Sequence, residues 1–537
     1  MSMITATAWV PRGFAAPFPT KYVFDEAEYS RIQELAKLQL DDAKEDLEEA
    51  QGKKSETNGS SEGTDLPQSN ADIDDDLKEY DLEHYDDDDE EKEQDENGVS
   101  MGIFGNIKSL AYHTSNDDDP YITLKDGDDD DDDREELQIL ATDNLVLAAR
   151  LEDEVAHLEV YVYEDTEDNL YVHHDIMLPA IPLAVEWLDL PVGQSGTERD
   201  SKGNFVAVGT MDPDIELWDL DTVDCMYPNA ILGQGQEDST KIDKTKKKKK
   251  KKSKKANDSY HVDAVLSLAA NRQHRNLLAS SSADKTIKLW DLNKTKCAKS
   301  YSYHTDKICS IAWHPVEATA LLSGSYDRTA AAGDMRTTEA DLRRCGIESD
   351  VEAVRWNPHD PNYFYVTTES GVVHYQDVRQ LTGDPAKSKA VWTLQAHDES
   401  VSAFDVNPII PGYLVTGSTD KEIKLWNVQA SGPSMVVSRN LGVGKVFSTT
   451  FAPDQEVGFR LAVAGSKGSV QIWDTSTNAA IRRAFANRVA SSEVEVEERL
   501  VSVKEDDSSS DEEGEGDEAM TDGNGHPDGW ESMEEST

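Results

Sequence analysis

Cysteine is scarce in this sequence, and the signals of a membrane or secreted protein are missing. Four cysteines occur in 537 residues, and none stands in a C-x-x-C pair. Scattered cysteines are typical of a reducing compartment and argue against a zinc site or a disulfide framework. No apolar run reaches the ~18 residues that a membrane helix needs, and the first residues lack the charged-then-apolar order of a signal peptide. We expect a soluble, intracellular protein without a membrane segment.

Recognisable catalytic motifs are also missing. The zinc signature H-E-x-x-H does not occur, and LGVGK at residues 441–445 is too short for a phosphate-binding loop and leads into an expected strand. Ser and His are numerous, but the regularly spaced ones belong to the repeat described below, which leaves no nucleophile–base pair with a signature of its own. We therefore expect a binding protein, not an enzyme, with no cofactor and no metal.

Basic residues are in deficit, since 107 Asp and Glu against 53 Lys and Arg give a formal net charge of −54. Residues 25–140 carry a net −31 and residues 491–537 a net −16, which leaves −7 for the rest of the chain. Segments this polar cannot bury a core, so we expect one folded unit of about 350 residues with disordered acidic additions. Because the folded part is nearly balanced, the acidic total does not exclude nucleic-acid binding.

A repeat organises the folded part. A His is followed nineteen residues later by Ser or Thr, then after four by Asp and after six more by Trp, with Gly333 replacing Trp in the middle copy. Asp at a polar turn can accept backbone N–H groups, while His and Ser or Thr can link it to the indole. We expect these residues to hold the fold. They are His261, Ser280, Asp284 and Trp290; His304, Ser323 and Asp327; and His397, Thr416, Asp420 and Trp426.

This spacing, with copies that end in Trp-Asp, resembles the WD40 family, whose repeat is a four-stranded blade of a β-propeller. Trp-Asp-like pairs from Trp218 to Trp473 mark six blades, and Tyr161 takes the Trp place in a seventh. TAWVP (7–11) has the form of expected inner strands such as IAWHP (311–315), so residues 1–11 are expected to supply the first strand of blade one. The resemblance implies an all-β, seven-bladed WD40 β-propeller over residues 141–490.

Three blades depart from the repeat. Gly333 and Gln376 stand at the Trp positions of blades four and five, and Lys467 stands at the Asp position of blade seven. Blades five and seven also lack the upstream His. We expect these three blades to hold by packing alone.

Two acidic segments and one basic loop extend the propeller. Residues 12–140 form an expected insertion in blade one, with a helix near 25–51 and an apolar stretch at 98–112 that suits a docking peptide. Residues 491–537 form an expected disordered tail, in which Ser508, Ser509 and Ser510 resemble acid-directed kinase sites. The lysine loop, residues 241–258 between blades two and three, suits a nuclear address, a non-specific RNA contact, or both. Its tract comprises Lys246, Lys247, Lys248, Lys249, Lys250, Lys251, Lys252, Lys254 and Lys255.

Insertions and blades together resemble one WD40 subfamily, the periodic tryptophan proteins. The resemblance is carried by TAWVPRGFAAPFPTKYVFDEAEYSRIQELA (7–36), SMGIFGNIKSLAY (100–112), the lysine loop and LASSSADKTIKLWDL (278–292). It implies an assembly factor for the large ribosomal subunit in the nucleus and nucleolus. The implied partners are precursor ribosomal RNA, other assembly factors, ribosomal proteins and an import receptor, with the protein a monomer in a large complex.

In a WD40 blade, the loops between the first and second strands and between the third and fourth strands share one face, here called the loop face. We expect its basic residues to contact RNA phosphates and the lysine loop to emerge from the opposite face. The basic residues are Arg272, Arg275, Lys294, Lys296, Arg336 and Arg379. Two other functions stay open. The acidic segments suit histones and thus a chromatin protein, and Asp-x-Arg at 334–336 and 377–379 occurs in substrate receptors of cullin ubiquitin ligases.

Overall fold

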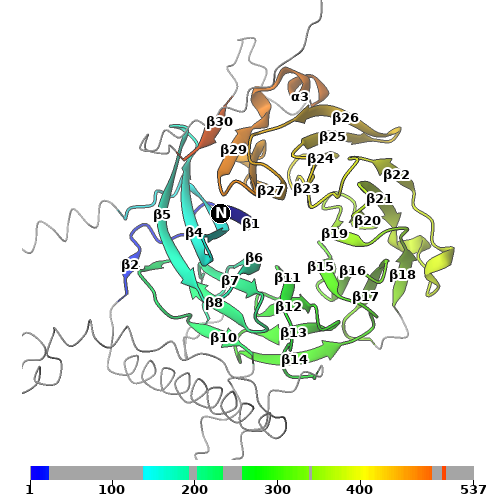
Figure 1. The fold of residues 1–537 in the computed structure, drawn as a ribbon, viewed down its shortest axis with the longest axis horizontal. Helices are drawn as coiled ribbons and strands as arrows, with labels where there is room; N and C mark the ends of the chain where they lie inside the picture. Colours follow the sequence, from blue (N-terminus) through cyan, green and yellow to red (C-terminus); the bar gives the residue numbers. More distant parts are fainter. Residues whose placement is uncertain are drawn as a thin grey trace, which may run out of the picture. The chain divides into compact units, whose positions relative to one another are not determined.

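The computed structural model describes residues 2–22, 137–192, 202–233, 257–337, 342–485 and 499–503. The chain divides into a larger unit (Met1–Phe14, Thr142–Trp218 and Asn229–Thr537) and a smaller one (Ala15–Ala141 and Asp219–Pro228). In the larger unit, seven four-stranded sheets surround a central channel (Figure 1). The predicted seven-bladed propeller is therefore confirmed. In the smaller unit, β2 (Thr20–Lys21) pairs in parallel with β9 (Thr222–Val223).

The first four blades run from the channel outward in chain order. Blade one contains β1 (Ser2–Val10), β3 (Asn144–Glu152), β4 (Val155–Glu164) and β5 (Asn169–Leu178). Blade two contains β6 (Pro182–Leu188), β7 (Phe205–Thr210), β8 (Ile215–Asp219) and β10 (Ala230–Leu232). Blade three contains β11 (Val265–Ala270), β12 (Leu277–Ser282), β13 (Ile287–Asp291) and β14 (Lys296–Tyr301). Blade four contains β15 (Ile308–Trp313), β16 (Ala320–Ser325), β17 (Thr329–Asp334) and β18 (Arg343–Gly346).

The last three blades follow the same order. Blade five contains β19 (Val351–Trp356), β20 (Tyr363–Thr368), β21 (Val372–Asp377) and β22 (Trp392–Gln395), with the short helices η6 (Val378–Gln380) and η7 (Pro385–Lys387). Blade six contains β23 (Ala403–Val406), β24 (Tyr413–Gly417), β25 (Ile423–Gln429) and β26 (Gly432–Arg439). Blade seven contains β27 (Val446–Phe451), β28 (Arg460–Gly465), β29 (Val470–Asp474) and β30 (Leu500–Ser502), with η8 (Gln455–Val457), η9 (Thr475–Thr477) and α3 (Ala479–Ala484). In the part of the chain described here, every helix is too short to cross a membrane.

The turn between the second and third strands shows why the repeat forms a blade. In blade three, Asp284 Oδ1 accepts the backbone N–H of Thr286 at 2.9 Å, and Lys285 between them has a φ of 69°. Blades four and six repeat this turn. A positive φ costs least for glycine. Gly371 and Gly468 therefore take the place of Lys285 in blades five and seven, where the Asp is absent.

The N-terminal strand closes the ring. β1 pairs antiparallel with β3 along its whole length, so this blade combines the start of the chain with residues from beyond the insertion. Trp9 Nε1 donates to the carbonyl oxygen of Thr450 in blade seven at 3.0 Å. Trp313 makes the same contact with Ala269 in the preceding blade, and blade five repeats it with blade four. The shared form of TAWVP and IAWHP thus reflects one recurring hydrogen bond between blades.

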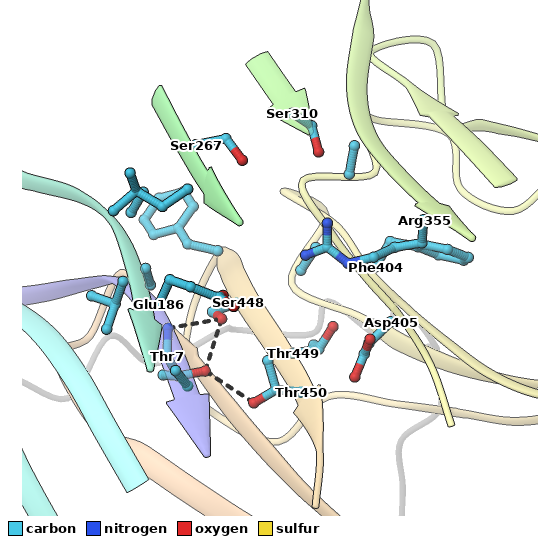
Figure 2. A pocket seen from close by; sticks show the side chains of 18 of the residues that line it. Thr7, Glu186, Ser267, Ser310, Arg355, Phe404, Asp405, Ser448, Thr449 and Thr450 are labelled. Atoms are coloured by element: carbon cyan, nitrogen blue, oxygen red, sulfur yellow. Dashed lines mark hydrogen bonds between the residues drawn. The ribbon is translucent and has the colours of Figure 1, made fainter. Parts of the chain in front are cut away.

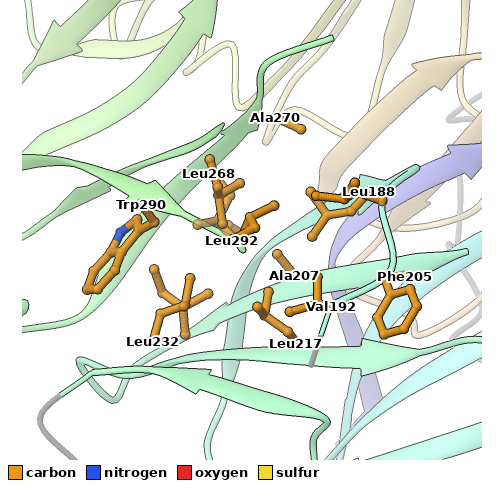
Figure 3. Packing of buried hydrophobic residues seen from close by; sticks show 14 of the residues in the cluster. Leu188, Val192, Phe205, Ala207, Leu217, Leu232, Leu268, Ala270, Trp290 and Leu292 are labelled. Carbon is orange, nitrogen blue, oxygen red and sulfur yellow. The ribbon is translucent and has the colours of Figure 1, made fainter. Parts of the chain in front are cut away.

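The hydrophobic core lies between neighbouring blades. Between blades two and three, Leu217, Leu232 and Leu268 belong to one buried cluster with the indole of Trp290 (Figure 3). Each fully buried leucine stabilises the fold by about 1.5–3 kcal/mol relative to an exposed one. Because a blade buries its faces only against its neighbours, the ring must close for every blade to be stable.

Candidate functional site

Blade three contains the polar chain that the repeat predicts. Asp284 Oδ2 lies 2.9 Å from His261 Nδ1, and His261 Nε2 lies 2.7 Å from Ser280 Oγ, to which Trp290 Nε1 donates at 2.8 Å. Burial lowers the pKa of His261. Burial alone would raise the pKa of Asp284, but hydrogen bonds from His261 and Thr286 bring it to about 2. Blade six repeats this chain with His397, Thr416, Asp420 and Trp426, at 2.8, 2.8 and 2.9 Å.

The order Asp, His, Ser also occurs in the catalytic triad of serine hydrolases. Whether these hydrogen-bonded residues could act as a triad depends on whether a substrate can reach the serine hydroxyl. The Ser280 residue and the side chain of His261 are 0% exposed. Ser280 Oγ is already hydrogen-bonded to both His261 and Trp290. A substrate carbonyl cannot reach this hydroxyl, and we therefore assign the polar chain to holding the blade.

Blade four keeps the polar chain although Gly333 replaces Trp. His304 lies 2.9 Å from both Asp327 and Ser323, through its two ring nitrogens. The hydroxyl of Tyr303 lies 2.9 Å from Ser323 Oγ and takes the place of the indole. The prediction that this blade holds by packing alone is wrong, because an aromatic residue next to the His reaches the same serine.

A charged clamp joins blade seven to blade one. Arg460 Nη1 lies 2.5 Å from Asp474 Oδ1 and Nη2 lies 2.7 Å from Asp165 Oδ1, while Nε donates to the Tyr163 hydroxyl at 3.1 Å. Arg499 donates to the carbonyl oxygen of Asp165 at 2.6 Å. These five residues are the seam clamp. The prediction of packing alone is wrong for blade seven as well, because Arg460 comes from a strand position that the repeat motif does not include.

Two of the basic residues predicted to contact RNA tie blade three to blade two. Arg272 Nη2 lies 3.0 Å from Glu186, and its guanidinium lies 5.1 Å from the centre of the Trp187 ring. Arg275 Nε lies 2.8 Å from Asp189. Both arginines therefore help to hold blade three against blade two, whether or not they also contact a ligand.

The other four predicted RNA contacts are more exposed. Lys294, Arg336 and Arg379 each pair with an aspartate near the end of the preceding strand, at 3.2, 2.6 and 2.8 Å, and their side chains are 76%, 74% and 55% exposed. Exposed pairs contribute only about 0–1 kcal/mol, so these cations can exchange the carboxylate for a phosphate. Lys296 is exposed and makes no ion pair with any described residue. The structure does not gather the six into one cluster but spreads them over three blades.

Several predicted features lie outside the described residues. They are the lysine tract from Lys246 to Lys255, the serines from Ser508 to Ser510, the helix expected near 25–51 and the apolar stretch at 98–112.

The central channel is a site that the sequence analysis missed. It encloses about 400 Å³ between the inner strands, and Glu186, Arg355 and Asp405 line it (Figure 2). Asp405 Oδ2 accepts the backbone N–H of a blade-seven residue, Phe451, at 2.8 Å. Burial raises the pKa of Asp405 to about 6, and the charge of Arg355 opposes this shift. Arg355 and Asp405 both occupy the place of Ala312 in IAWHP, so a comparison of the inner strands would have revealed them.

Among the described residues, no group of three or more His, Cys, Asp or Glu side chains is placed to hold a metal ion. The charged groups of the channel and of the loop face are instead suited to binding by hydrogen bonds and ion pairs.

Comparison with known proteins agrees with the fold and extends over the insertions. The family described as WD domain, G-beta repeat matches residues 255–291, 295–331 and 388–427, which include the three polar chains. An uncharacterised WD repeat-containing protein of Schizosaccharomyces pombe is 52% identical over 94% of this chain and 95% of its own length. Periodic tryptophan protein 1 of Saccharomyces cerevisiae is 38% identical over 93% of each chain, and its Drosophila melanogaster homologue is 29% identical over 90% of this chain and 96% of its own. The chain therefore belongs to the WD40-repeat family of periodic tryptophan protein 1.

Proposed function

We propose that this protein is a non-enzymatic scaffold in the assembly of the large ribosomal subunit, binding precursor ribosomal RNA, other assembly factors and ribosomal proteins in the nucleolus. The observation that carries the proposal is the similarity to periodic tryptophan protein 1, which spans 93% of both chains and so includes the segments outside the blades. Among the described residues, the serines of the two Asp–His–Ser chains, Ser280 and Ser323, are both 0% exposed, and this burial supports a role without chemistry.

The loop face offers the chemistry that single-stranded RNA recognises, because cations and aromatic rings alternate on it. Lys202 Nζ lies 5.1 Å from the centre of the Phe14 ring, which meets the Trp187 ring edge-on at 4.7 Å. Arg272 covers Trp187 in turn. Phosphates favour such cations, and an unstacked base favours a partly exposed ring such as Phe14, whereas Trp187 is 5% exposed and supports Phe14 from below the surface.

Weak contacts suffice for a scaffold when several act together. The loop face and the lysine tract are two basic features of one chain, so binding of one raises the effective concentration of the other. The lysine tract is also a candidate address for an import receptor. A variant of the protein that lacks the lysine tract should then bind RNA more weakly and enter the nucleus less efficiently.

The proposal is tested by crosslinking the full-length protein to RNA in cells and sequencing the crosslinked nucleotides. We expect sites in precursor ribosomal RNA, and we expect the double variant Lys294→Glu and Lys296→Glu to reduce them severalfold. Arg272 and Arg275 are unsuitable for this test because their ion pairs join two blades. Lys307→Glu with Lys421→Glu is the matched control, since it makes the same charge change in segments that connect strands at the other edge of the blades.

Two outcomes would replace this proposal. Binding of histones that survives about 0.5 M salt, where exposed charge pairs are screened, with no RNA recovered, would favour a chromatin protein. Co-purification with a cullin adaptor, lost on substitution of Arg336 and Arg379, would favour a ubiquitin-ligase receptor.

A further inference from the structure

Blade five carries a stack of aromatic rings on three neighbouring strands. Tyr363 of β20 and Tyr375 of β21 stack at 4.9 Å with an angle of 9° between their planes, and Tyr375 and Trp392 of β22 stack at 5.0 Å and 21°. Tyr365, which is 1% exposed, contacts both Tyr375 and Trp392 and also Phe404 of blade six. The stack is thus held rigidly on a buried aromatic base.

The stack places an aromatic ring at a position that other blades fill with an aliphatic residue. Tyr375 directly precedes Gln376, which stands at the Trp position of the repeat. In blades three, six and seven the residue that directly precedes the Trp is aliphatic, namely Leu289, Leu425 and Ile472. The buried core of this region is already formed by residues such as Tyr365, Val373 and Phe404. Tyr375 and Trp392 pack against this cluster, and they and Tyr363 are only partly buried.

A cation lies at the Tyr363 end of the stack, and an exposed lysine precedes Trp392 in the sequence. The guanidinium of Arg379 lies 5.4 Å from the centre of the Tyr363 ring and donates to its hydroxyl at 3.1 Å, while 55% of the side chain stays exposed. Lys389 is exposed, stands three residues before Trp392, and makes no ion pair with any described residue. Trp392 belongs to the outermost strand, and the described rings that contact it are Tyr365 and Tyr375.

We infer that this stack is a binding site for the bases of single-stranded RNA, in which a base continues the stack on Trp392 and its phosphates contact Lys389 and Arg379. The inference rests on the proposed function and names the part of the propeller that contacts the RNA bases. Base stacking on aromatic side chains tolerates any sequence, because every base has a π-face. Cations beside the rings favour a nucleic acid over a proline-rich peptide, which also docks on aromatic grooves but carries no phosphate.

The test measures binding of a fluorescently labelled single-stranded RNA, a uridine 20-mer, to the full-length protein by anisotropy. We expect Trp392→Leu to weaken binding about fivefold or more, the loss that removal of one stacking ring produces, and Trp392→Phe to restore most of it. Tyr326→Leu is the control, because Tyr326 is also a partly exposed ring, 37% exposed, but lies in a turn of blade four away from the stack. Melting temperatures of all variants are recorded to separate loss of binding from loss of fold.

The outcomes distinguish this inference from the proposed function. Undiminished RNA binding by Trp392→Leu, while the wild-type protein still crosslinks to precursor ribosomal RNA, would overturn the stacking site and leave the scaffold standing. Failure of the wild-type protein to bind any RNA would remove both. Equal losses for Trp392→Leu and Trp392→Phe, or displacement of the RNA by an uncharged proline-rich peptide, would also count against base stacking on this ring.

Discussion

Replacement of Arg460 by methionine should open the ring at its seam. The Arg460 side chain is 10% exposed and Asp474 is 5% exposed, so Arg460→Met leaves a buried carboxylate without its main partner. Removing one member of a buried ion pair costs about 3–5 kcal/mol. With an unfolding entropy of about 2.1 cal/mol/K per residue over roughly 340 described residues, 3 kcal/mol lowers the melting temperature by about 4 °C.

The assay is thermal unfolding followed by circular dichroism, with hydrogen exchange of β1 and β30 as a local measure. Arg483→Met is the matched control: it makes the same chemical change in blade seven, but Arg483 is exposed and, among the described residues, donates to a backbone carbonyl of its own helix. Its melting temperature should stay within about 1 °C of the wild type, as for an ordinary surface change. Arg460→Lys should lie between, because lysine keeps the charge but not the forked geometry. Equal melting temperatures for Arg460→Met and the wild type would refute the clamp.

Three further predictions concern the blades. Ser280→Ala should lower the unfolding free energy by about 1–3 kcal/mol, because it leaves the buried N–H of Trp290 without an acceptor and the buried Nε2 of His261 without a donor. Ser281→Ala should not, since Ser281 Oγ has no partner among the described residues, and urea denaturation compares the two variants. Gly333→Ala places a methyl group 2.3 Å from Leu342 and should cost about 1–3 kcal/mol, while Gly383→Ala, with open space around it, should be neutral in the same assay. Burial raises the pKa of Glu216 to about 7, above its unfolded value, so its ionised form destabilises the fold at pH 8 and this cost fades as the pH falls towards 5. Glu216→Gln should therefore raise the melting temperature at pH 8 and not at pH 5; a gain that is independent of pH would contradict the assignment.

The spacing of His, Ser or Thr, Asp and Trp was enough to predict the propeller, because each residue satisfies a hydrogen bond within its own blade. His261 and Asp284 are 23 residues apart, and the contact between them follows from one local topology. TAWVP was recognisable as an inner strand for a similar reason, since Trp9 repeats the contact that Trp313 makes. Local rules of this kind leave a periodic mark on the sequence.

The contacts that the sequence analysis missed do not recur at a fixed spacing in the sequence. Tyr303, which lies in the loop after β14, takes the role of an indole that other blades supply from their third strand. Arg460 meets Asp165, which lies 295 residues away in the chain. The basic residues of the loop face were identified by their positions, but the sequence did not show that Arg272 and Arg275 are held by carboxylates of the neighbouring blade. Contacts between blades depend on how far each side chain reaches across the interface.

The sequence by itself determined the seven blades, the residues that hold the regular ones, and the concentration of acid outside the ring. The tertiary structure decided how the irregular blades are held, which side chains line the channel, and where rings stack at the surface of blade five. The physical reason is distance along the chain: hydrogen bonds within a blade recur at fixed spacing, whereas ring closure joins Arg460 to Tyr163 across 297 residues with no period to record it.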